Sequence, residues 1–182
     1  MTKVQQSAEV HTIDLRGIAG AILALAVAAI LAGVLGFATS GWLIQDRSNS
    51  ETTQHGLWET CNCDTIKIKD RQDWFQAVQA LTTIGLGFGA IALLGAGFYV
   101  CIHGCCTKGG MLITVLIGSI CSAIFSVVGL IIFAVKKNEL KRGGSHEDNP
   151  SLSWSFAFIA IGAGFFVIVA VLSSIQFYRA RR

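Results

Sequence analysis

Four long apolar runs without a charged side chain are the feature that most constrains this sequence. They cover residues 17–38, 77–102, 110–135 and 154–178, and none contains Asp, Glu, Lys, Arg or His. A helix needs about 20 such residues to cross the hydrocarbon core of a bilayer. Of the 182 residues, 53% are hydrophobic and only 14% are charged. The chain is therefore predicted to be an all-α membrane protein, a four-helix transmembrane bundle in a single domain over residues 1–182.

The first run has a competing interpretation as a secretory signal peptide. Residues 37–40, Phe-Ala-Thr-Ser, could be a cleavage site. Apolar segments of signal peptides span only about 7–15 residues, and this run is longer. We therefore expect a membrane helix here. In the second run, Gly85 and Gly89 form a small-xxx-small pair that allows close helix approach, although glycine is also simply frequent in membrane helices.

Two polar loops are expected on the outer side of the membrane, a first loop at 39–76 and a second loop at 136–153. Both termini and the short connector at 103–109 would lie in the cytosol. The connector is so short that the second and third helices must form an antiparallel hairpin. Lys and Arg are denser on the side of the termini but fewer in number, so the positive-inside rule gives only weak support. The arginines at the end of the chain and the thiols of the first loop favour this orientation, in a multi-pass protein of the plasma membrane.

The first loop carries tryptophans and cysteines that are unusual in a connector. Its notable residues are Trp42, Gly56, Leu57, Trp58, Cys61 and Cys63. The loop is too short to bury a core of its own in water, so it needs a covalent cross-link. Cysteines can supply one if this side of the membrane faces an oxidising compartment. Indole rings are favoured at the membrane interface. We expect Trp58 to bury its ring against the outer ends of the helices.

A short strand is predicted in the same loop. Residues 65–69, Thr-Ile-Lys-Ile-Lys, alternate apolar and polar side chains with the period of a half-buried strand. The first loop is therefore expected to build a small extracellular β-sheet. A bridge between Cys61 and Cys63 would close a strained ring, because bridged Cα atoms lie about 5.5–6 Å apart. A bridge within the chain, a bridge between chains and two free thiols all stay open.

Several classes of function are disfavoured by the composition. Transporters, proton pumps and intramembrane enzymes usually need charged or histidine side chains or broken helices within the membrane, and the four runs contain no Asp, Glu, Lys, Arg or His. No serine, histidine and acid form a recognisable catalytic triad, so no enzyme activity and no cofactor are expected. The net charge of +3 is small and dispersed, which disfavours a nucleic-acid partner.

A group of cysteines follows the second run. Cys101, His103, Cys105 and Cys106 lie close together, but their spacing matches no standard zinc signature, and we expect no metal site. Cysteines next to the membrane are common sites of palmitoylation, which makes these three candidates for it. The alternative is that they are plain buried or interfacial thiols.

The tryptophan, the Gly-Leu-Trp triplet and the cysteines of the first loop resemble the W…GLW…C…C signature of the claudin and peripheral myelin protein superfamily. This resemblance implies four membrane helices, cytosolic termini, and a longer first and a shorter second extracellular loop. Residues 73–80, 107–110 and 153–158 are similar to the helix junctions of the peripheral myelin and epithelial membrane proteins, which is the closer branch. Claudins usually carry an arginine where Gln79 stands. The family's two cysteines also lie further apart than they do here.

The resemblance implies a structural role in which the extracellular loops meet a neighbouring cell, in adhesion or a paracellular barrier. The first loop holds six acidic and four basic residues, and the second holds three and four. Because these charges nearly cancel, a barrier is favoured over a selective pore. The alternative is an accessory subunit that modulates the trafficking or gating of an ion channel or receptor. The expected partners are the lipid bilayer and either other four-span proteins, in the same or an apposed membrane, or a channel subunit; self-association stays open.

Overall fold

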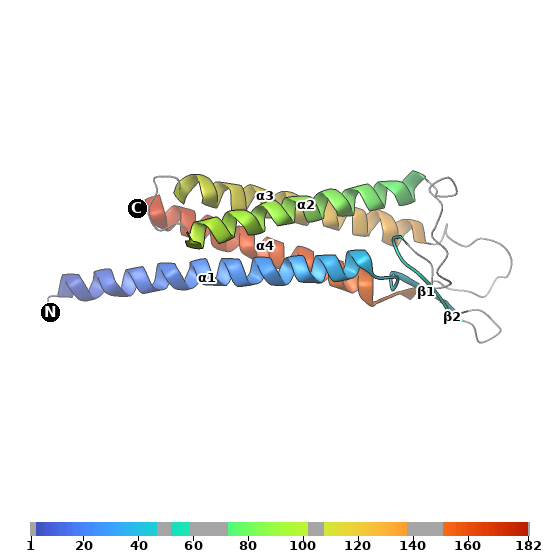
Figure 1. The fold of residues 1–182 in the computed structure, drawn as a ribbon, viewed down its shortest axis with the longest axis horizontal. Helices are drawn as coiled ribbons and strands as arrows, with labels where there is room; N and C mark the ends of the chain where they lie inside the picture. The colour runs from blue at the N-terminus through green and yellow to red at the C-terminus, as the bar shows by residue number, and fades with distance from the viewer. Residues whose placement is uncertain (1–2, 47–51, 59–72, 102–107, 138–150, 182) are drawn as a thin grey trace.

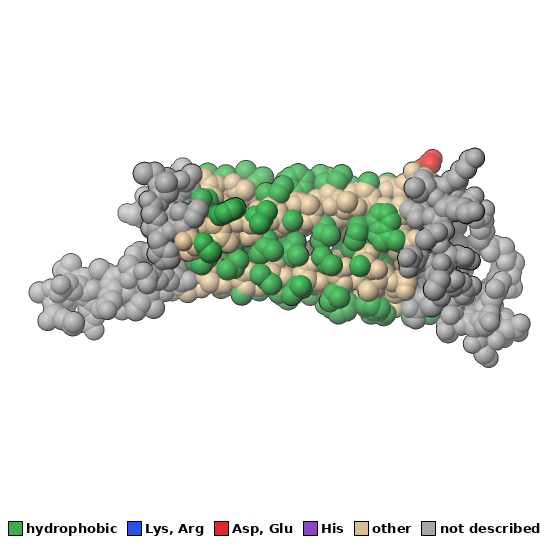
Figure 2. Space-filling model, viewed as in Figure 1, with side chains coloured by type: hydrophobic (Ala, Val, Ile, Leu, Met, Phe, Trp, Pro, Cys, Tyr) green, Lys and Arg blue, Asp and Glu red, His purple; other side chains and the backbone are tan. Residues whose placement is uncertain are grey.

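The structure is a computed structural model that describes residues 3–46, 52–58, 73–101, 108–137 and 151–181. Within these ranges the chain forms four long helices, α1 Lys3–Ala38, α2 Asp73–Cys101, α3 Lys108–Lys136 and α4 Trp154–Arg181. Each contains a segment long and apolar enough to cross a membrane. Hydrophobic side chains spread over the visible face of the helical section, as contact with lipid requires (Figure 2). The predicted four-helix membrane bundle is confirmed.

The helices form a ring in which each packs chiefly against two others. α1 lies against α2 and α4, and α3 lies against the same two helices from the other side. α2 and α3 run antiparallel (Figure 1). α1 is the longest helix and projects beyond the others at its beginning, and α4 ends at that same end of the bundle (Figure 1). The strands lie at the opposite end, which we call the sheet end.

A three-stranded antiparallel sheet forms the sheet end. β1 Leu43–Asp46 lies in the middle, between β2 Thr52–His55 and β3 Ser151–Leu152. The predicted small sheet is confirmed, but it is not built from the first loop alone, because β3 belongs to the second loop. A strand of two residues is too short to show a period in the sequence. The strand predicted at residues 65–69 lies outside the described residues.

The interior changes in character along the bundle. At the sheet end it is aromatic, with Trp42, Phe75 and Phe133 in one buried cluster. In the middle, alanines from α1, α2 and α3 meet the buried ring of Phe166. Small residues let helices approach closely in a membrane, where hydrophobic attraction between helices is absent. The bundle is therefore filled by large rings at one end and by close backbone contact in the middle.

The glycine pair of α2 takes part in this close contact, but its two members face different neighbours. A Cβ at Gly85 would lie 2.8 Å from Ser126 Oγ of α3, and a Cβ at Gly89 would lie 2.6 Å from the ring of Phe166 in α4. Gly87, on the outer side of the same helix, has open space around it. The pair thus serves packing within this chain.

Candidate functional site

The first residue of the signature, Trp42, is the anchor of the first loop. Its side chain is completely buried, and its Nε1 donates a hydrogen bond of 2.7 Å to the carbonyl of Gly36 in α1. Its ring meets the edge of Phe133 in α3 at 4.9 Å between centroids and lies 6.2 Å from Phe156 in α4. A buried indole needs a partner for its N–H group, and here the end of a helix supplies it. Trp42 therefore connects β1 to three helices.

The turn before β1 is tied to the start of α4 by hydrogen bonds. Ser155 N donates to the carbonyl of Gly41 at 2.9 Å, and Ser153 N donates to that of Trp42 at 3.1 Å. The hydroxyls of Thr39 and Ser155 lie 2.7 Å apart. The first N–H groups of a helix have no partner within it, and the turn supplies one for Ser155. The end of α1 and the beginning of α4 are thus joined through the first loop.

Two glycines make this close approach possible. A Cβ on Gly36 would lie 2.6 Å from the carbonyl oxygen of Ser155, closer than real Cβ contacts allow. A Cβ on Gly41 would overlap the indole of Trp154. Both positions need the absence of a side chain, because the neighbouring atoms are backbone or a rigid ring. Sequence reasoning missed these two glycines. The Gly-Trp pair that follows the first apolar run is a signal that could have identified Gly41.

The second part of the signature is held by α2. Gly56 and Leu57 are buried, and the carbonyl of Leu57 accepts a hydrogen bond of 2.5 Å from Nε2 of Gln79. Gln79 is itself only 6% exposed. A polar amide in an apolar setting must find a partner, and so must the carbonyl of a residue that lies outside helix and sheet. Gln79, at the position where claudins usually carry an arginine, therefore fixes the segment after β2.

Trp58 has a different place from the one expected. It is 37% exposed, and its ring packs on the edge of Phe37 with 5.1 Å between centroids. The expectation that Trp58 buries its ring is wrong. Leu57 takes the inward position next to it, and the fully buried indole is that of Trp42. A half-exposed indole at the end of a membrane helix suits the interface between lipid and water.

The other predicted site residues add little to the description of the site. Cys61, Cys63, Cys105 and Cys106 lie outside the described residues. Cys101 is exposed at the end of α2. Among the residues that the structure describes, no group of three metal-ligating side chains comes together. The contacts at the sheet end thus fix parts of both loops against the four helices.

The comparison with protein families agrees with this arrangement. The model of the PMP-22/EMP/MP20/Claudin family matches residues 15–173, from before the first membrane segment into α4. A search of curated proteins finds no match to the chain. The family is generally non-enzymatic, and a closer likeness to its peripheral myelin and epithelial branch stays a prediction. The chain belongs to the PMP-22/EMP/MP20/Claudin family and is a four-span membrane protein of the junction and adhesion kind.

Proposed function

We propose that the protein acts at cell–cell contacts of the plasma membrane, in adhesion or in a paracellular barrier, and that its two loops act together as one surface. The observation that carries this proposal is the pairing of β1 with β3, in which Leu43 faces Leu152 and Ile44 faces Ser151. A strand from each loop is thereby fixed in one sheet. The anchor around Trp42 holds this sheet on the bundle, so a partner meets a rigid platform instead of two independent loops.

The proposed orientation places the sheet end outside the cell. α1 begins and α4 ends at the other end of the bundle, so both termini would then lie in the cytosol (Figure 1). Tags on Met1 and Arg182 are expected to bind antibody only after the cells are permeabilised. Staining of either tag on intact cells would contradict this orientation and, with it, a loop platform that faces another cell.

A barrier is better supported than a selective pore. The first loop holds six acidic and four basic residues, and the second holds three acidic and four basic residues. These charges nearly cancel and leave little net electrostatic field. Selectivity among ions arises from rings of charge or from converging dipoles. Nor do the membrane segments carry an Asp, Glu, Lys, Arg or His side chain that could guide ions through the bundle. The proposal is therefore a contact between surfaces.

Mixed cell cultures test this function. Cells that express the fluorescently tagged protein are grown beside cells that express it with a second colour, or beside cells without it. We expect enrichment only at contacts where both cells express the protein. Enrichment at contacts with non-expressing cells would mean a different partner. No enrichment, together with co-purification of a channel or receptor, would instead support the accessory-subunit alternative.

A variant with a disturbed anchor sharpens the same experiment. Gly41→Ala places a methyl group against the indole of Trp154 and should move the sheet relative to α4. Gly87→Ala, whose new methyl group points into open space, is the matched control. We expect Gly41→Ala to reach the surface in smaller amounts and to lose enrichment at contacts even when surface levels are matched. Normal enrichment of Gly41→Ala would show that the platform is not needed.

We also propose that the thiols at the opposite end are palmitoylated. Cys101 is exposed at the end of α2, where it would lie at the cytosolic face of the membrane. Cys105 and Cys106 follow it in the connector. Acyl exchange with a mass tag should add up to three tags to the wild type and none to the variant with all three replaced by serine. An untagged wild-type protein would contradict the proposal.

A further inference from the structure

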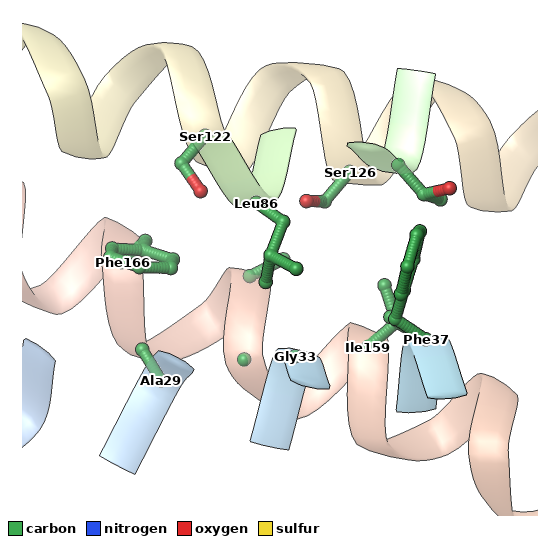
Figure 3. A pocket seen from close by; sticks show the side chains of 11 residues that line it. Ala29, Gly33, Phe37, Leu86, Ser122, Ser126, Ile159 and Phe166 are labelled. Atoms are coloured by element: carbon green, nitrogen blue, oxygen red, sulfur yellow. The ribbon is translucent and has the colours of Figure 1, made fainter. Parts of the chain in front are cut away.

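A small cavity lies in the centre of the bundle, where all four helices meet (Figure 3). Gly33 of α1, Leu86 of α2 and Phe166 of α4 form its apolar walls. Ser122 and Ser126 of α3 form a polar wall. The cavity has room for about one water molecule. It is too small for a lipid chain or an aromatic ligand.

The hydroxyl of Ser122 is the unusual group in this wall. Ser122 is 1% exposed, and its Oγ has no hydrogen-bond partner among the described residues. Hydroxyls within helices commonly donate to a carbonyl one turn earlier, as Thr82 and Ser174 do here. In Figure 3 the hydroxyls of Ser122 and Ser126 instead point into the space beside Leu86. A buried hydroxyl aimed into a cavity indicates a ligand that exchanges hydrogen bonds with it.

The neighbouring helix shapes the space around these hydroxyls. The missing side chain of Gly85 leaves room for Ser126 Oγ, which would lie 2.8 Å from a Cβ at that position. Leu86 reaches across to α1, where its Cδ1 would be 3.0 Å from a Cβ on Gly33. The residues of α1 and α2 therefore limit the space beside the two hydroxyls of α3, and its volume admits a ligand no larger than water.

We propose that this cavity binds one water molecule, which bridges the hydroxyls of Ser122 and Ser126 within the membrane. A buried water needs two to four polar partners. Thr82 also lines the cavity, and because its hydroxyl already donates to the carbonyl of Val78, its oxygen is free to accept from the water as a third partner. The hydrocarbon around the bundle offers these groups no alternative partner, so the water joins α2 and α3 at the level of the cavity.

Thermal unfolding of serine variants in lipid nanodiscs tests the water, because a hydrated and a dry cavity give effects of opposite sign. If water is bound, Ser122→Ala removes one of its partners and should lower the Tm by about 2–4 °C. If the cavity is dry, the same change removes an unsatisfied hydroxyl and should raise the Tm. Ser119→Ala is the matched control. Ser119 is a buried serine of the same helix whose Oγ also has no partner among the described residues, but it does not line the cavity.

We expect Ser119→Ala to leave the Tm unchanged or to raise it. An unchanged or higher Tm for Ser122→Ala would overturn the proposal. The double variant Ser122→Ala with Ser126→Ala adds a second criterion, because a water that bridges the two hydroxyls is weakened by the loss of either one. The fall in Tm of the double variant should therefore be smaller than the sum of the two single losses. Two losses that simply add would show that no molecule bridges the two hydroxyls.

Solid-state NMR of the wild-type protein in lipid bilayers detects the water directly. Magnetisation should pass from water protons to the backbone amide protons of Ser122 and Ser126. The amide of Ile124, on the exposed face of the same helix segment, is the control and should receive none in the hydrocarbon region. Transfer absent at both serines, or equal at all three residues, would contradict a water bound inside the bundle.

Discussion

The sheet end and the centre of the bundle solve the same problem in two different ways. At the sheet end, large rings pack together, as Trp42 and Phe133 do with 4.9 Å between their centroids. Hydrogen bonds such as that of Trp42 Nε1 hold the chain where it leaves the helices. In the centre, Gly85 and Gly89 let neighbouring helices approach closely, and the hydroxyl of Thr82 donates within its own helix. The difference follows from the backbone, because a helix satisfies its own polar groups in lipid and a loop does not.

Substitutions in the two regions should therefore act in different ways. A residue of the sheet end has a specific partner, so its loss should be felt through a named hydrogen bond or ring contact. A residue of the centre has mainly to be small, so its replacement should matter only when the new side chain meets a neighbour. Each variant is therefore paired with a control change of the same residue type or at the same position, which isolates the contribution of one contact.

The largest effect is expected for Trp42→Ala. Removing a completely buried indole should lower the free energy of unfolding by about 3–5 kcal/mol. Trp58→Ala is the control, because a half-exposed indole contributes less, and we expect a loss of about 1 kcal/mol. Calorimetric unfolding of the purified protein in mild detergent measures both. Equal losses for the two tryptophans would contradict the assignment of Trp42 as the anchor.

Gly36→Ala should come next. Its methyl group would lie 2.6 Å from the carbonyl oxygen of Ser155, so α1 and α4 must move apart, which should destabilise the protein by about 1–3 kcal/mol. Gly87→Ala adds the same methyl group in open space and should be neutral or stabilising by up to about 1 kcal/mol. Unfolding by a denaturant, with helix content followed by circular dichroism, compares the pair. If Gly87→Ala were the more harmful change, the packing between α1 and α4 would not be as described.

Gln79→Leu should have a smaller but more local effect. It leaves the carbonyl of Leu57 without this donor, and we expect a loss of about 1–2 kcal/mol. Gln79→Arg keeps N–H donors at the position, so it should retain a hydrogen bond to this carbonyl, although the buried charge carries a cost of its own. Hydrogen exchange read by mass spectrometry should show faster exchange in residues 52–58 for Gln79→Leu than for Gln79→Arg. Identical exchange in both variants would show that this hydrogen bond does not hold the segment.

The sequence alone could predict the bundle but only part of the site. The four helices follow from runs without charge, because lipid tolerates few alternatives. The signature marks Trp42 and Trp58 equally, since both are tryptophans in a polar loop. Which of them is buried depends on the position of Gly36 and Phe133, and these lie in other elements.

The pairing of the two loops was beyond sequence reasoning for a related reason. β3 has only two residues, both exposed, so it leaves no alternation to recognise. Its partner Ile44 is separated from it by most of the chain. The role of Gln79 was equally hidden, because its amide serves a carbonyl, and a carbonyl is present at every residue. Contacts made through the backbone leave no trace in residue type.

A cysteine cross-link between the loops tests the central claim, that they form one sheet, most directly. Ile44 and Ser151 are partners across β1 and β3, and antiparallel partners lie at about 4.5–5.5 Å between Cα atoms, which suits a disulfide. We expect Ile44→Cys with Ser151→Cys to link under mild oxidation, as shown by mass spectrometry of the joined peptides. Gln45→Cys with Ser151→Cys is the control, because a shift of one residue places the side chain on the other face. A link in the control pair alone, or equal yields in both pairs, would contradict the sheet.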